Sequence, residues 1–70
     1  MSDARQAIAV AREAGAAEHA VASLREAEEF LDKAQRGLAT RAFVQARRDA
    51  VSAKNKALEA LSVAEAQRPR

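Results

Sequence analysis

The sequence has no cysteine, tyrosine or tryptophan, and its 70 residues include only one proline and two glycines. Without cysteine, the chain forms no disulfide and offers no thiolate for catalysis or metal binding. It also lacks the run of roughly 18 apolar residues that a transmembrane helix needs. Because Asp3, Arg5 and Arg12 interrupt the early apolar positions, we expect neither a membrane span nor a signal peptide.

The residues that dominate instead are alanine, glutamate, lysine, arginine and leucine, a composition typical of long helices. The length predicts a single helical domain over residues 1–70, near the lower size limit for independent folding. Alanine buries little area, so support from self-association or from a neighbouring domain is favoured. The net charge of +2 gives only a weak preference for anionic partners.

Local signals predict helices at about residues 2–14, 21–37 and 41–67. Ser2 and Asp3 suit the first helix start, where they satisfy exposed amides and complement the helix dipole. Gly15 opens a connector over residues 15–20, and Pro69 is expected to end the third helix.

Two further signals are expected at the ends of the second helix. Ser23 and Glu26 have the spacing of a capping box, in which each side chain accepts a hydrogen bond from the other residue's backbone amide. Gly37 and Thr40 predict a tight turn over residues 37–40, with Thr40 capping the third helix.

The apolar spacing predicts an all-α fold, an antiparallel three-helix bundle with coiled-coil-like alanine packing. The third helix carries one nearly pure alanine stripe and a second apolar line roughly 120° away, with Arg47 and Lys54 between them. A helix with two apolar seams usually contacts two neighbours, which favours three helices over two. The stripe comprises Ala39, Phe43, Ala46, Ala50, Ala53, Ala57, Ala60 and Ala64, and the second line comprises Val44, Val51 and Leu58.

One alternative fold has a single long helix over residues 3–38. Gly15 inside a helix costs only about 1 kcal/mol relative to alanine, and no proline interrupts the connector. The chain would then be a two-helix hairpin that must dimerise.

No arrangement of residues predicts catalysis, a cofactor or a metal site. His19 is the single histidine, and no nucleophile–base pair accompanies it. The acidic residues Glu26, Glu28, Glu29 and Asp32 have cations alongside, which favours a solvated ion-pair face over a cation site. We therefore expect a protein that is not an enzyme.

Two candidate contact surfaces lie on the third helix. Its end is predicted to overhang the second helix, leaving Leu58, Leu61, Val63 and Ala64 partly bare and available for self-association. The exposed cations Arg41, Arg48 and Lys56 form a candidate anion contact for a cell-wall polymer, lipid head group or nucleic acid. Nucleic acid is the least expected of these, because no aromatic side chain interleaves the cations.

The alanine and leucine spacing resembles a known family. The matching residues are Ala4–Ala16, His19-Ala20, Leu24–Ala27, Leu31, Ala34, Leu38 and Phe43–Ala46. They resemble an alanine-rich domain-of-unknown-function family of bacterial envelope proteins and lipoproteins, whose members often precede an OmpA-like, peptidoglycan-associating domain. The chain has His19 and Val21 where the family shows an aromatic residue and a proline, and it lacks a lipid-bearing cysteine.

This resemblance implies a periplasmic or outer-membrane-associated protein, with cell-wall contact through a neighbouring domain. The sequence as a whole predicts a non-catalytic structural or interaction module that self-associates or binds a protein partner. The alternatives are an anion-binding adaptor and a cytoplasmic scaffold that binds a partner helix along Val44, Val51 and Leu58.

Overall fold

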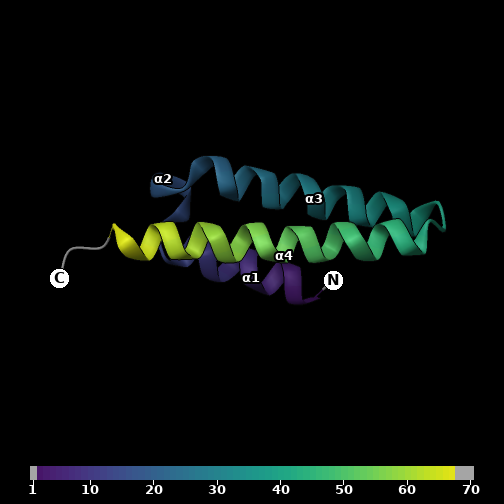
Figure 1. Ribbon diagram of the computed structural model, residues 1–70, viewed down its shortest axis with the longest axis horizontal. Coiled ribbons are helices and arrows are strands. Elements are labelled where there is room, and N and C mark those ends of the chain that lie inside the picture. Colours follow the sequence, from purple (N-terminus) through teal and green to yellow (C-terminus); the bar gives the residue numbers. More distant parts are fainter. Residues whose placement is uncertain (1, 68–70) are drawn as a thin grey trace.

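The computed structural model describes residues 2–67 as an all-α bundle. Its helices are α1 (Ser2–Glu13), α2 (Ala16–His19), α3 (Val21–Ala39) and α4 (Phe43–Ala66). Helices α3 and α4 form a long antiparallel hairpin, and α1 lies along it, antiparallel to α3 and parallel to α4 (Figure 1). The predicted antiparallel three-helix bundle is therefore confirmed. The predicted stop at Pro69 lies outside the described residues.

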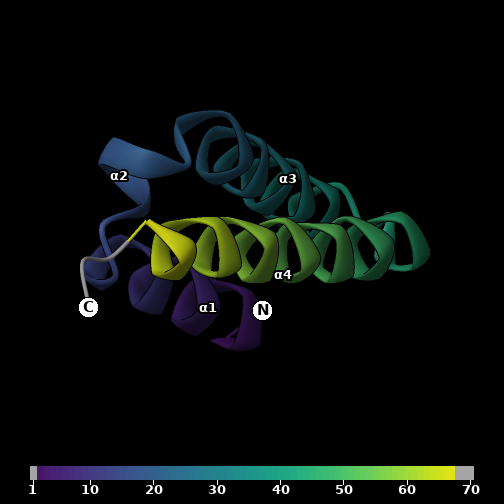
Figure 2. The same ribbon diagram turned by 60° about the vertical axis from the view of Figure 1, so that its left-hand side comes forward.

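The connector between the first two long helices is short and structured. Gly15 adopts a left-handed conformation with φ of 92°, and its amide donates to the carbonyl of Arg12 at 3.0 Å. Glycine carries no Cβ penalty in this conformation, so α1 ends here and the predicted single helix over residues 3–38 is wrong. The single turn of α2 then crosses the end of the bundle, where α3 begins and α4 ends (Figure 2).

Neither predicted cap of the second and third helices forms. The N-cap of α3 is Ala20, without a side-chain hydrogen bond, and the Ser23 hydroxyl instead donates to Glu59 of α4 at 3.1 Å. The Thr40 hydroxyl donates to the carbonyls of Arg36 and Gly37, so Thr40 closes α3 and does not start α4.

The hairpin turn lies later than predicted, at residues 40–42. Arg41 has a φ of 63°; its amide donates to the carbonyl of Leu38, and the amide of Ala42 donates to that of Gly37. This is a Schellman motif with arginine in the position that glycine usually takes. Gly37 is helical, and a Cβ there would lie 3.0 Å from the Cβ of Ala46, so this glycine permits close approach of α3 and α4.

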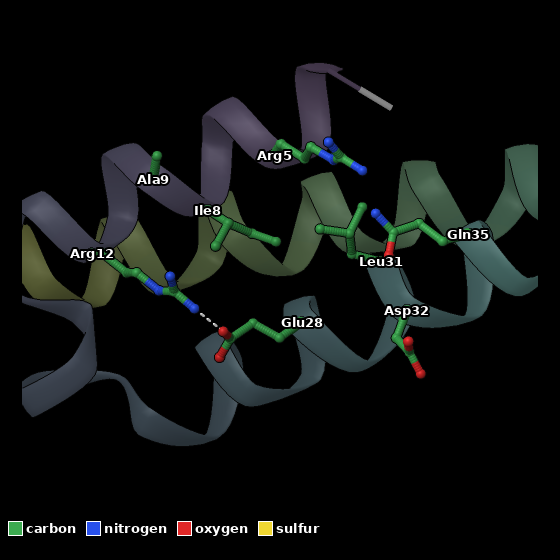
Figure 3. Close-up of a pocket in the computed structure, with 8 residues that line it drawn as sticks. All are labelled: Arg5, Ile8, Ala9, Arg12, Glu28, Leu31, Asp32 and Gln35. Atoms are coloured by element: carbon green, nitrogen blue, oxygen red, sulfur yellow. Dashed lines mark hydrogen bonds and ion pairs between the residues drawn. The ribbon is translucent and has the colours of Figure 1, made fainter.

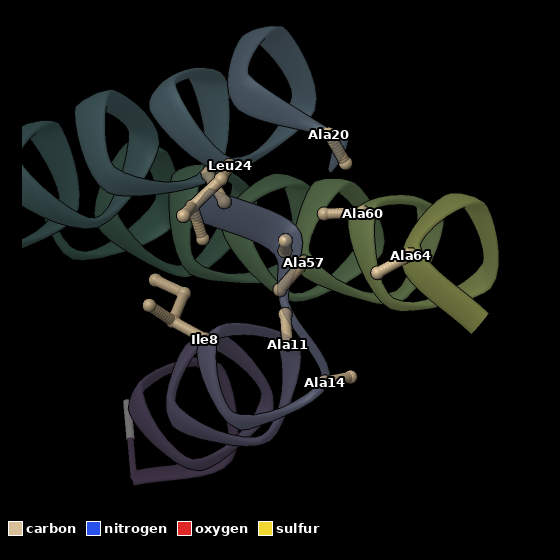
Figure 4. Packing of buried hydrophobic residues seen from close by; sticks show 10 residues of the cluster. Ile8, Ala11, Ala14, Ala20, Leu24, Ala57, Ala60 and Ala64 are labelled. Atoms are coloured by element: carbon tan, nitrogen blue, oxygen red, sulfur yellow. The ribbon is translucent and has the colours of Figure 1, made fainter. Parts of the chain in front are cut away.

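The core consists mainly of alanine, as the stripe predicted from Ala46 to Ala64, but Ala39 and Phe43 at the start of the predicted stripe are exposed because no helix covers the hairpin tip. Among the described residues, only Ile8 and Leu24 are large apolar side chains that are buried, and the alanines around them are almost inaccessible. Figure 4 shows Ile8 of α1 and Leu24 of α3 pointing toward one another, with the α4 alanines beside them. The central cluster comprises Ile8, Ala11, Ala14, Ala16, Ala20, Leu24, Ala27, Ala57, Ala60 and Ala64.

Candidate functional site

The second apolar line of α4 borders α1 but is not buried by it. Val51 lines a hollow with Asp3 and Ala4 of α1, and Leu58 lines another with Ala7 and Val10. Val44, Val51 and Leu58 nevertheless remain 70%, 53% and 46% exposed, so the prediction that this line is a second buried seam is wrong. Helix α1 packs on the strip between the two lines, so the Arg47 and Lys54 side chains line a hollow beside Asp3 of α1. We call Val44, Val51 and Leu58 the outer seam.

The predicted overhang exists in part: α4 extends beyond the start of α3 (Figure 1), but its core face there is not bare. Helix α2 and the end of α1 cover this end of α4, and Ala64 is completely buried there. Leu61 is partly buried against the same cluster, while Leu58 and Val63 stay exposed. Leu58 and Val63 are five residues apart, roughly 140° round the helix, so they do not form one surface.

The three candidate anion contacts are not brought together. The Lys56 Nζ lies 3.3 Å from a carboxylate oxygen of Glu26 and 3.3 Å from one of Glu59. Hydrogen bonding to Glu26, and next to Glu59, raises the pKa of Lys56 above its ordinary value. Arg48 lies eight residues earlier on α4, roughly 12 Å along the axis, and Arg41 lies in the turn. The positive charge of Lys56 is thus already balanced by two carboxylates. Anion binding by Arg41, Arg48 and Lys56 stays a prediction.

Three of the four acidic residues of α3 form ion pairs, as the sequence predicted, although their partners lie partly on other helices; Glu29 forms none within residues 2–67. Glu26 contacts Lys56 of α4, and Asp32 contacts Arg36 at 2.7 Å. Arg12 of α1 contacts Glu28 across the hollow between α1 and α3, whose far end lies between Arg5 and Gln35 (Figure 3). The pairs of Glu26 and Glu28 join α3 to α4 and α1, whereas the Asp32–Arg36 pair lies within α3.

Formal charge is unevenly distributed along the hairpin. Residues 30–54 carry six Lys and Arg and two Asp, a net charge of +4. The remaining described residues, 2–29 and 55–67, carry four Lys and Arg and eight Asp and Glu, a net charge of −4. The one acidic residue in the first half of α4, Asp49, is buried and accepts a hydrogen bond from Gln45 at 3.2 Å. The hairpin tip is therefore basic and the opposite end acidic.

An open groove lies at this basic tip. It has a volume of about 370 Å³ and is lined by Leu38 of α3 and by Phe43, Ala46, Arg47 and Ala50 of α4. We call it the tip groove. The sequence pattern placed four of its five residues on the expected apolar faces and the fifth, Arg47, beside them, but it gave no signal that α1 would leave them uncovered.

Residues 2–67 offer no metal-binding group of three or more histidine and acidic side chains. His19 is exposed at the end of α2. No helix in this part of the chain has both the length and the apolar character of a membrane span.

Comparison with known proteins adds no relative: no family model, curated protein or solved structure matches the chain. The resemblance to the alanine-rich envelope family stays a prediction, as does the compartment that it implies.

Proposed function

We propose that the protein is a non-catalytic interaction module that self-associates through the outer seam of α4. The observation that carries this proposal is the exposure of Val44, Val51 and Leu58 at seven-residue spacing on one helix face. Seven-residue spacing keeps these side chains on one line of the helix and supplies one of the two apolar positions that recur in each heptad of a coiled coil. Isolated exposed valines are ordinary on a protein surface, whereas an aligned row on one helix is typical of an interface.

The charge distribution favours an antiparallel pair. If two copies lay parallel, the two basic segments 30–54 would meet, and like charges across an interface disfavour association. In the antiparallel arrangement the basic tip of each copy lies beside the acidic end of its partner. The same argument predicts that the pair weakens as salt is added, because exposed charges are screened.

Sedimentation across a concentration series tests the association. We expect the unaltered protein to form dimers and Val51→Asp to remain monomeric, because a carboxylate at the centre of the seam would lose its hydration. Val21→Asp is the matched control, since Val21 is a similarly exposed valine (48% against 53%) at the start of α3. A monomeric unaltered protein, or equal association of both variants, would contradict the proposal.

Inter-copy distance measurement tests the orientation. The chain has no cysteine, so Ala42→Cys carries a spin label at one position only, in the exposed turn. With a symmetry axis near Val51, antiparallel copies hold the two labels at least about 25 Å apart along the helix. Parallel copies would hold them about 10 Å apart, the spacing of paired helices. The short distance would exclude the antiparallel arrangement while leaving self-association intact.

A further inference from the structure

The tip groove continues the surface on which α1 lies. Asp3 and Ala4, in the first turn of α1, line a hollow together with Arg47 and Ala50 of α4. Arg47 and Ala50 also line the tip groove, so the groove begins where α1 begins and extends away from it toward the turn. In Figure 1 the hairpin extends well beyond α1 in this direction.

The part of the hairpin that α1 covers and the open tip groove are lined by similar residues. On α3, Leu24, Leu31 and Leu38 recur every seven residues on the face toward α1; Leu24 is buried and Leu31 partly buried, but Leu38 is 45% exposed. On α4, buried Ala46 forms the floor of the tip groove, just as Ala57 and Ala60 form the floor beneath α1. Alanine floors with leucines at the edge admit a helix at close range.

The dimensions fit a short helical segment. The groove extends along α4 from Phe43 to Ala50, a separation of seven residues or roughly 10 Å along the helix axis. Two turns of a helix lying end to end with α1 would cover this length. A segment of this size that repeats the contacts of α1 would place small or aliphatic residues on Ala46, Leu38 and Phe43.

The charge of the groove defines its partner further. Arg47 is part of the lining, and Arg41 lies in the adjoining turn. Asp49 is buried and bonded to Gln45, so it does not neutralise these cations at the surface. An occupant with acidic side chains beside its apolar face would match this potential, whereas a basic helix would be repelled.

We propose that the tip groove binds an amphipathic helix of a protein partner, end to end with α1, through small apolar residues flanked by acidic ones. This surface is separate from the outer seam, because Val44, Val51 and Leu58 take no part in its lining. Binding here consequently does not depend on self-association through α4.

The test uses a helical peptide with the apolar spacing of α1 and glutamate at the flanking positions, titrated into Val51→Asp protein. This background removes the outer seam, so failure of the proposed function and failure of this proposal are observed separately. We expect saturable binding, with amide resonance shifts centred on Leu38, Phe43 and Ala46. A peptide with lysine in place of glutamate is expected to bind at least about tenfold more weakly.

Two neighbouring arginines provide matched variants. Arg47→Glu places a negative charge in the groove and is expected to weaken peptide binding by roughly tenfold or more. Arg48→Glu makes the same charge change on α4 outside the groove lining and is expected to change affinity by no more than about threefold. Equal effects of the two variants, or equal binding of the two peptides, would overturn the proposal. Groove resonances that move with protein concentration alone would identify a second copy as the occupant and also overturn it.

Discussion

The α3–α4 hairpin is covered at one end and open at the other, although similar residues line both ends. Around Ala57 and Ala60, α1 and α2 complete the core, and the alanines of the central cluster are almost inaccessible. Around Ala46 the alanine contact persists between α3 and α4, but Leu38 and Phe43 remain exposed. Alanine stripes alone therefore bring two helices together; a third helix determines whether the larger side chains at the edge become buried.

The covered end and the open tip of the hairpin also differ in formal charge. The covered end joins α3 to its neighbours through Glu26–Lys56 and Arg12–Glu28 and is acidic overall. The open end carries a net excess of arginine and lysine and a single acidic residue on α4 that points away from solvent. A surface with an apolar floor and a positively charged edge is suited to a protein partner with acidic side chains. At the covered end, by contrast, the charged residues pair with one another and hold the helices together.

Truncating two equivalent leucines gives the largest expected contrast between these ends. Leu24 and Leu38 lie fourteen residues apart on the same α3 face, 5% and 45% exposed. We expect Leu24→Ala to lower the free energy of unfolding by about 2–4 kcal/mol, because it leaves a cavity in the core. Leu38→Ala should cost less than about 1 kcal/mol, because little area is lost. Urea unfolding followed by circular dichroism measures both, and equal costs would show that the tip is covered in solution.

Enlarging two alanines of the α4 stripe makes the opposite change. Ala57→Leu inserts volume where α1, α3 and α4 meet and should cost about 1–3 kcal/mol by overpacking. Ala50→Leu adds the same atoms at the edge of the open tip groove, and we expect a change within about 0.5 kcal/mol. Thermal unfolding of the two variants side by side provides the measurement. A large cost at residue 50 would mean that the groove is too narrow for a helix.

Much of this fold follows from the sequence, because spacing reports which residues are apolar. The α4 stripe from Ala46 to Ala64 was predicted by that rule, and the end of the first helix at Gly15 was predicted from the low helix propensity of glycine. Periodicity does not report how far a short helix extends along a longer one. The cover that α1 and α2 give to the end of α4, and the uncovered hairpin tip beyond α1, were therefore not predicted.

The candidate site was predicted less well, for a related reason. A row of apolar residues at seven-residue spacing looks the same in sequence whether a neighbouring helix covers it or it faces solvent. The outer seam was consequently identified but assigned to the core. The tip groove was missed because it depends on where α1 begins relative to α4, which is a property of tertiary packing.

The two helix ends that use a left-handed residue provide the smallest expected contrast. Gly15 ends α1, and Arg41 occupies the equivalent position after α3 with a φ of 63°. A residue with a Cβ loses roughly 1 kcal/mol or more in this conformation, so Gly15→Ala should destabilise the protein by about that amount. Arg41→Gly should stabilise it by roughly 1 kcal/mol, less the entropy that glycine loses on folding. Arg41→Ala is the control: it removes the charge and keeps the Cβ, so a gain with alanine equal to that with glycine would assign the effect to charge and leave no strain at the hairpin turn.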